Sequence, residues 1–208
     1  LNFVALLGWA PSDAHEIKTV DEIAQDFRIN EISSSNSIFE YDKLNWMNGQ
    51  YIKKMDIKEL TQKVKPFLSK YDLTELTEVQ LEKVILATRE PITILSDLEH
   101  DVAYFFGKDV VYDAGVKEEN IDTAQAQDIL KYFDSQLEGY DFENEEKLHE
   151  QMAEFRTYFK EKYGIKPKVT MWTIRAALTG RTRGADMGVI LDVLGKDKVR
   201  YRIKKAIV

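Results

Sequence analysis

The sequence predicts an all-α fold, and three observations support this prediction. The chain has 208 residues, of which only ten are Gly and four are Pro, so residues that interrupt helices are scarce. Residues that favour helices, namely Leu, Ala, Glu, Lys and Gln, are abundant. No stretch alternates apolar and polar residues as a half-buried strand would. We therefore expect about ten helices joined by short loops.

Six residues are predicted to cap helix N-termini, because Thr, Asp and Asn side chains accept hydrogen bonds from free N–H groups of a first turn. The predicted caps are Thr19, Asp42, Asp56, Thr77, Asp122 and Asn144. Thr19 is followed by Glu22, which completes a capping box. Pro66 and Gly164 are expected to end helices, and Pro167 to occupy the first position of the next one.

The middle and the end of the chain carry further helical patterns. Four apolar residues spaced for one helix face predict a helix over 92–106; they are Ile94, Leu98, Val102 and Phe105. Three shorter helices are expected over 169–180, 185–195 and 196–207. A change of composition at 113–120 suggests a boundary there. We expect three units, at 1–56, 57–113 and 114–208.

The formal net charge of −7 is unevenly distributed along the chain. Residues 160–208 contain 13 Lys or Arg against four acids, a formal charge of +9, so residues 1–159 carry −16. Such asymmetry indicates a polyanion-binding end on an acidic body. A basic surface that binds nothing is the alternative interpretation.

Residues for catalysis are scarce in this sequence. The absence of Cys excludes disulfides, thiolate zinc sites and cysteine nucleophiles, and it fits a reducing compartment. His15, His100 and His149 are scattered rather than spaced as metal ligands, so no metal site is expected. No apolar run reaches the about 20 residues of a membrane span, and no basic signal-peptide region is present. We expect a cytoplasmic protein without a catalytic centre in this sequence.

One face of the expected helix after Pro167 carries the residue types that bind unstacked bases. Its members follow one another at helical spacing and are Lys168, Trp172, Arg175 and Thr179. An aromatic ring stacks on a base, a guanidinium donates to base edges and an ammonium pairs with phosphate. The opposite stripe of Ile174, Ala177 and Leu178 suits the core. The alternative is that Trp172 is a core residue and Arg175 a surface ion-pair partner.

The segments on either side of residue 185 add further cations. Arg181 and Arg183 lie in a glycine-flanked loop before a helix N-terminus, which is a favourable arrangement for an anion. The last expected helix adds six cations: Lys196, Lys198, Arg200, Arg202, Lys204 and Lys205. Few acids are near them in sequence. A phosphate-bearing, single-stranded partner is therefore favoured over duplex nucleic acid.

These segments resemble bacterial-type class I glutamyl-tRNA synthetases. LNFVALLGWAP, at 1–11, resembles the family segment that follows its KMSKS-type loop. The stem-contact signature KL-x-W-x-N-x-x-Y is matched by Lys43, Leu44, Trp46, Asn48 and Tyr51. The segments KPFL, IRAALTGR and LGKDKVRYRI resemble the terminal anticodon-binding domain of the family. All of these matches occur in family order.

The resemblance implies a function in tRNA recognition. It implies a stem-contact segment followed by two helical anticodon-binding subdomains, which grip tRNA(Glu) as a monomer without contacting DNA or a membrane. The residues expected to contact the anticodon are Arg89, Trp172, Arg175, Thr179, Gly180, Arg181, Arg183 and Met187. Backbone contacts would come from Lys168, Lys196, Lys198, Arg200, Lys204 and Lys205. The parent enzyme ligates glutamate to tRNA with ATP and Mg²⁺, but its HIGH and KMSKS-type motifs are missing here, so this sequence alone is expected to be inactive and to need no cofactor.

One position departs from the family pattern. Some members have an arginine that helps to read the first anticodon base and separates tRNA(Glu) from tRNA(Gln). Pro91 holds that place here, with Arg89 two residues earlier. Recognition of tRNA(Gln) as well therefore stays open. Two other functions also stay open: a helical module that docks a basic partner through the acidic 159 residues, and an independent enzyme.

Overall fold

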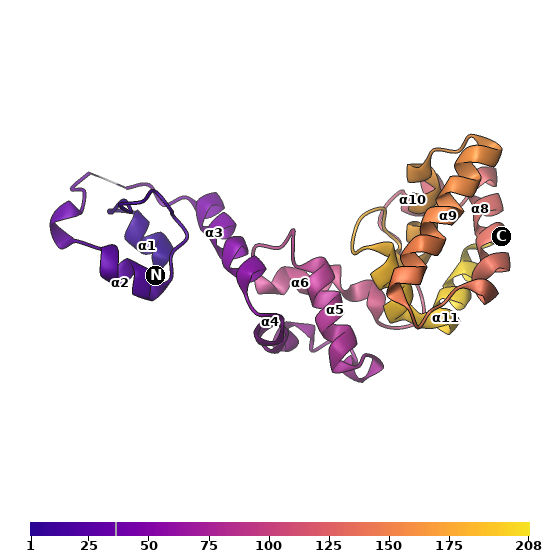
Figure 1. Ribbon diagram of the computed structural model, residues 1–208, viewed down its shortest axis with the longest axis horizontal. Helices are drawn as coiled ribbons and strands as arrows, with labels where there is room; N and C mark the ends of the chain where they lie inside the picture. Colours follow the sequence, from indigo (N-terminus) through magenta and orange to yellow (C-terminus); the bar gives the residue numbers. More distant parts are fainter. Residues whose placement is uncertain (36) are drawn as a thin grey trace.

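The computed structural model describes residues 1–35 and 37–208, and no strand occurs among them, which confirms the all-α prediction. The helices follow one another along an elongated molecule, from α1 and α2 at one end to α8–α11 at the other (Figure 1). Their bounds are α1 Asn2–Leu6, α2 Val20–Asp26, α3 Tyr41–Lys54, α4 Ile57–Val64, α5 Glu78–Thr88, α6 Leu98–Asp101, α7 Val116–Asn120, α8 Ala124–Gln136, α9 Glu145–Tyr163, α10 Pro167–Thr179 and α11 Met187–Ala206.

Most of the predicted caps are confirmed. Side-chain oxygens of four predicted residues accept backbone hydrogen bonds at helix starts, and these residues are Thr19, Asp56, Thr77 and Asn144. Asp42 was the wrong residue, because α3 begins at Tyr41, two residues earlier than capping by Asp42 would require, and Asp42 lies in its first turn. Thr123 caps α8 in place of Asp122, which pairs with Lys117 instead.

The continuous helix predicted over 92–106 is wrong. The segment consists of α6 flanked by the 3-10 turns Leu95–Asp97 and Ala103–Phe105. The apolar pattern still predicted burial correctly for Leu98, Val102 and Phe105, whereas Ile94 is exposed. The helix is not continuous because Ile94 is extended, with φ −134° and ψ 151°, and because the N–H groups of Phe105 and Phe106 bond three residues back, to Val102 and Ala103.

The end of the chain agrees with the prediction. The two helices expected over 185–195 and 196–207 are the two halves of α11, which is interrupted at Gly195 by a non-helical φ of 69° and ψ of 164°. Gly164 ends α9 in the left-handed conformation, and Pro167 is the first residue of α10, as predicted. The kink lets the two halves of α11 pack against different neighbours.

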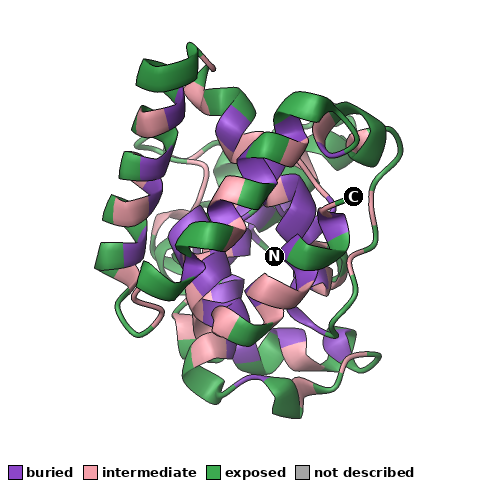
Figure 2. Cartoon of the chain, turned by 90° about the vertical axis from the view of Figure 1, so that its right-hand side faces the viewer, coloured by how far each residue is buried: buried purple, intermediate pink, exposed green. Residues whose placement is uncertain are grey.

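Buried apolar residues between Ile52 and Ala206 form one contiguous core cluster. Its members line the inner faces of the helices, and exposed residues cover the outer faces (Figure 2). The cluster crosses the predicted boundary at 113, whereas Phe3, Trp9 and Met47 are buried outside it. The division into 1–56, 57–113 and 114–208 therefore stays a prediction, and the last two units share a core.

Arg202 fastens the last helix to the middle of the chain. Its guanidinium is 1% exposed and donates to the carbonyl oxygens of Leu178 at 2.6 Å, Tyr104 at 2.8 Å, Gly107 at 3.0 Å and Lys108 at 3.1 Å. Burial lowers the pKa of Arg202 to about 10. The sequence-based expectation that Arg202 belongs to a free cationic surface is wrong.

Candidate nucleic-acid interface

The amino-terminal half of α10 presents a cation and an aromatic ring together. The Lys168 ammonium lies 4.2 Å from the centroid of the Trp172 ring, and Lys168 is exposed while Trp172 is half-buried. The opposite stripe of Ile174, Ala177 and Leu178 is fully buried, as predicted. Trp172 is therefore not a core residue. The pair offers an aromatic edge and a positive charge to a partner.

Arg175 and Thr179 lie further along the same helix but are partly or fully enclosed. Arg175 donates through Nη1 to the carbonyl oxygen of Ala185, and burial lowers its pKa. Thr179 is 2% exposed; its hydroxyl donates to the Arg175 carbonyl at 2.8 Å and accepts from the Arg181 backbone N–H at 3.2 Å. The expected free hydroxyl at Thr179 is therefore absent, because the turn after α10 uses it.

Two glycines allow the loop after α10 to take its path. Gly180 is buried with φ 74°, and a Cβ atom there would overlap the carbonyl group of Val111. Its own carbonyl accepts from the backbone N–H of Asp113 at 2.9 Å. Gly184 has φ 141°, and a Cβ atom there would lie 2.9 Å from the Tyr104 hydroxyl. Gly180 therefore allows the turn after α10 to pack directly against the backbone of residues 111–113.

The loop is tied to the segment that contains α6. Arg181 donates through Nη2 to Nε2 of His100 at 2.9 Å and to the His100 carbonyl at 3.0 Å. The Tyr104 hydroxyl accepts from the backbone N–H of Ala185 at 3.1 Å. Arg181 therefore fixes the loop, and it is only partly exposed. Arg183 is exposed and makes no hydrogen bond or ion pair with a described residue.

Met187 is 3% exposed and packs in the core at the start of α11. The expectation that its side chain faces an anticodon base is not met by this geometry. The helical spacing of apolar residues along α11 is a signal that favours a core position for Met187.

A cleft of about 480 Å³ lies between the end of α5 and the loop after α10. Its lining includes Glu90, Pro91, Asp113, Arg181, Arg183 and Ala185. The family resemblance implies that the position of Pro91 and the loop of Arg181 and Arg183 both take part in anticodon recognition. In the structure, both segments line one cavity. Arg89 does not line the cleft, because its guanidinium donates to the Met55 carbonyl at 3.2 Å.

Half of the cations predicted on the last helix are paired with acids distant in sequence. Lys196 and Arg200 both contact Glu138, the former at 2.6 Å, and Lys198 contacts Glu75 at 3.1 Å. The expectation that these cations are free for phosphate is therefore wrong for these three, since folding brings Glu138 and Glu75 to them. Lys204 and Lys205 are exposed and form no ion pair with a described residue, so they are the free cations of α11.

The stem-contact motif on α3 joins the first segment of the chain to the rest. Lys43 pairs with Glu16 at 2.6 Å. The Tyr51 hydroxyl lies 2.7 Å from both the Asn2 side-chain oxygen and the Lys18 carbonyl. These contacts hold α1 and the segment before α2 against α3.

Two further motif residues face outward. Asn48 donates to the carbonyl oxygen of Thr93 at 2.6 Å, and Gly49 allows the neighbouring Ile92 carbonyl to approach. Trp46 is 46% exposed. Most residues of the motif therefore hold neighbouring segments against α3, and one aromatic side chain, Trp46, is available to a partner.

The described residues lack two other features. No group of three or more His, Cys, Asp or Glu side chains among them is arranged to hold a metal ion. No helix in residues 1–35 and 37–208 is both long and apolar enough to cross a membrane.

This arrangement of helices, cations and an open cleft is that of a helical nucleic-acid-binding module, and comparison with known proteins identifies its family. A family model described as "Anticodon binding domain" matches residues 59–207, so the chain belongs to the anticodon-binding domain family. The relatives are glutamate–tRNA ligases. The enzyme of Carboxydothermus hydrogenoformans is 30% identical over 98% of this chain and 42% of the relative. One from Pseudothermotoga lettingae is 33% identical over 98% of this chain and 41% of the relative.

Solved structures agree with this assignment. A glutamate–tRNA ligase from Elizabethkingia meningosepticum, in complex with its amino acid, superposes with a TM-score of 0.86 and 25% identity over 99% of this chain and 40% of that chain. A second, from Elizabethkingia anophelis, gives a TM-score of 0.82 and 25% identity over 99% of this chain and 39% of that chain. The chain thus spans about two fifths of the length of its relatives. The resemblance inferred from the sequence is confirmed, and the comparisons give no support to a protein-docking module.

Proposed function

We propose that this chain grips tRNA(Glu) and reads its anticodon as part of a glutamate–tRNA ligase. The observation that carries the proposal is the cleft between Pro91 and the loop 181–185, which joins two segments of an anticodon-binding domain in one cavity. A cavity of about 480 Å³ lies within the range of about 300–1,000 Å³ that encloses small ligands, and an extruded base is of that class.

Each exposed group has a definite task in this proposal. Arg183 donates to base edges or phosphate at the mouth of the cleft, and Lys168 with Trp172 holds a neighbouring stacked nucleotide. Lys204 and Lys205 pair with backbone phosphates. Arg175 and Arg181 donate to backbone carbonyl groups and so position the loop. Their effect on tRNA binding is therefore indirect, through the placement of Arg183 and the loop backbone. Trp46 on α3 contacts a different part of the tRNA.

The chemistry of ligation is assigned to the remainder of such an enzyme. In the relatives' class of reaction, ATP activates the amino acid and Mg²⁺ neutralises phosphate charge. The described residues provide no cluster of potential metal ligands, and the sequence has no glycine-rich phosphate loop, so these residues do not fit an ATP–Mg²⁺ site. No reaction step is therefore assigned to this chain. A cytoplasmic location and a monomeric state belong to the same proposal.

Filter binding of the 208-residue chain to tRNA transcripts that differ only in the three anticodon bases tests the function. We expect transcripts with the anticodon of tRNA(Glu) to bind more tightly than those with unrelated anticodons. Equal affinity for all anticodons would contradict the proposed reading. A transcript of tRNA(Gln) is included as well, because Pro91 provides no N–H donor at the position where the family pattern implies an arginine in some members. Comparable binding would indicate a non-discriminating domain.

A further inference from the structure

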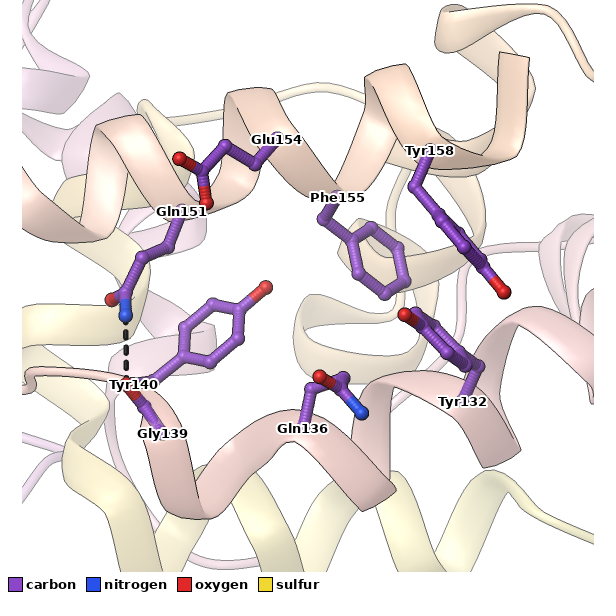
Figure 3. A pocket seen from close by; sticks show the side chains of 8 residues that line it. All are labelled: Tyr132, Gln136, Gly139, Tyr140, Gln151, Glu154, Phe155 and Tyr158. Carbon is purple, nitrogen blue, oxygen red and sulfur yellow. Dashed lines mark hydrogen bonds between the residues drawn. The ribbon is translucent and has the colours of Figure 1, made fainter. Parts of the chain in front are cut away.

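A second, smaller cavity lies between α8 and α9 and shares no lining residue with the proposed tRNA interface (Figure 3). Its volume is about 220 Å³. This is less than the about 300–1,000 Å³ of pockets that enclose whole small molecules, so it suits a single functional group on a short chain. Four of its eight lining residues are aromatic, and they are Tyr132, Tyr140, Phe155 and Tyr158.

Two polar side chains of the pocket, Gln136 and Glu154, have acceptor oxygens without a partner among the described residues. The Gln151 side chain is fixed to the wall of the pocket, since its amide donates to the Gly139 carbonyl at 2.7 Å and its oxygen accepts from the Asp141 N–H at 3.1 Å. Gln136 donates through Nε2 to Ser135 at 3.2 Å, which leaves its Oε1 without a described partner. Glu154 forms no ion pair or hydrogen bond with a described residue. Because an ionised carboxylate accepts hydrogen bonds and cannot donate them, a ligand that pairs with Glu154 must supply a donor.

The electrostatic character of the pocket is negative. Glu154 is the only ionised side chain that lines it, and neither Lys nor Arg does. Burial, together with the charges of Tyr132 and Glu154, raises the pKa of Tyr140, so its hydroxyl stays protonated and can accept a hydrogen bond through its free lone pairs. A phosphate or carboxylate would meet repulsion here, which separates this pocket from the surface proposed to bind tRNA.

The same aromatic cluster already contacts one ammonium group, that of Lys162, which does not line the pocket. The Lys162 ammonium lies 2.7 Å from the Tyr158 hydroxyl and 5.0 Å from the Tyr158 ring centroid. Tyr158 in turn stacks on Tyr132, with ring centroids 4.5 Å apart and planes 5° apart. Aromatic rings attract cations through their quadrupole, and a nearby carboxylate adds to that attraction.

We propose that the pocket between α8 and α9 binds a primary ammonium group carried on a short alkyl chain. The alkyl part lies against the rings of Tyr140 and Phe155. The ammonium group donates to the Glu154 carboxylate, the Gln136 side-chain oxygen and the Tyr140 hydroxyl. A lysine-like side chain or a polyamine end provides this chemistry.

Nuclear magnetic resonance titration of the 208-residue chain with n-butylammonium chloride tests the proposal. Backbone amide shifts of residues 132–140 and 151–158 are expected to move and to saturate, while a titration with n-butanol at the same ionic strength leaves them unsaturated. Spermidine is tested in parallel; tighter binding than n-butylammonium favours a polyamine, and equal binding favours a single lysine-like group.

Glu154→Gln removes the charge and keeps the shape, and we expect it to weaken n-butylammonium binding by about tenfold or more. Glu146→Gln is the matched control, since Glu146 is an exposed acid of α9 outside the pocket, and it should leave binding unchanged. Tyr140→Phe should weaken binding as well. Unchanged affinity in Glu154→Gln, or equal saturation by n-butanol, would overturn the proposal.

Discussion

Single residues decide whether the basic end of this chain reads nucleic acid or stabilises the protein. Arg202 and Arg183 come from the same positively charged stretch, yet Arg202 is buried against carbonyl groups and Arg183 is exposed. Composition treats both as equal charges. The two arginines differ in the number of protein acceptors around the guanidinium, and this difference decides which of them is available to a partner.

Arg202→Met is expected to lower the free energy of unfolding by about 3 kcal/mol, because it leaves buried carbonyl groups without a donor. Urea denaturation monitored by circular dichroism measures the change. Lys204→Met, at an exposed position of the same helix, should change stability by less than about 0.5 kcal/mol. Similar values for both variants would contradict the structural role given to Arg202.

Gly180→Ala and Gly164→Ala form a second matched pair. Both glycines have positive φ, of 74° and 68°, so alanine at either costs about 1–2 kcal/mol of backbone strain. A Cβ atom at Gly180 also overlaps the Val111 carbonyl, whereas nothing lies within 4 Å at Gly164. The Gly180 variant should therefore show the lower thermal midpoint of the two, and equal midpoints would refute this packing.

Arg183→Ala is expected to reduce the preference for the cognate anticodon, with a loss of about 1–3 kcal/mol in tRNA(Glu) binding if Arg183 makes a base contact. Lys204→Ala should weaken all transcripts alike and reduce the slope of log affinity against log salt by about one phosphate contact. Filter binding at several salt concentrations distinguishes the two effects. If Arg183→Ala lowered the affinity for all transcripts equally, Arg183 would contact phosphate rather than a base.

At the scale of elements, cations of α11 bind acids from other helices and turns. Glu138, which follows α8, contacts both Lys196 and Arg200, and these contacts hold its pKa below the usual value of 4.5. The kink at Gly195 comes just before this pair, so the second half of α11 begins at an anchored position. Pairing of this kind was invisible to sequence spacing.

Because the pKa of Glu138 is lowered by folding, its contribution to stability is present above about pH 4.5 and is lost as the pH falls through the lowered value. We expect Glu138→Gln to make the thermal midpoint less dependent on pH in that acidic range. Glu143→Gln, at an exposed residue without an ion pair, serves as the control. Identical pH profiles for the original chain and Glu138→Gln would contradict the linkage.

At the scale of the whole molecule, the loop 181–185 is held by residues from both sides of the shared core. Arg175 comes from α10, whereas His100 and Tyr104 come from the segment around α6. The proposed reading loop therefore depends on how the two predicted anticodon-binding subdomains are packed together.

Tyr104→Phe is expected to test this dependence. It keeps the buried ring but removes the acceptor of the Ala185 N–H, so the loop should lose its fixed conformation while the fold is retained. The ratio of affinities for cognate and unrelated anticodons should fall more than the affinity for unrelated transcripts. Tyr71→Phe provides the control, since the Tyr71 hydroxyl donates to the Glu99 carbonyl rather than to an atom of the loop 181–185.

The sequence by itself determined the helices and the family. Capping residues, the spacing of Ile174, Ala177 and Leu178, and the motif on α3 depend on local geometry, so one sequence is sufficient to predict them. The helix over 92–106 failed because Ile94 is extended and the turns on either side of α6 are closed by hydrogen bonds three residues back.

The tertiary structure decided which predicted site residues are available to a partner. It buried Thr179 and Met187, engaged Arg175 and Arg181 with backbone groups, and left Arg183 exposed beside the cleft. It also paired three of the cations of α11 with acids distant in sequence. Sequence shows which charges exist, but their partners are fixed by packing, because hydrogen bonds and ion pairs act over a few ångströms between residues that the fold brings together.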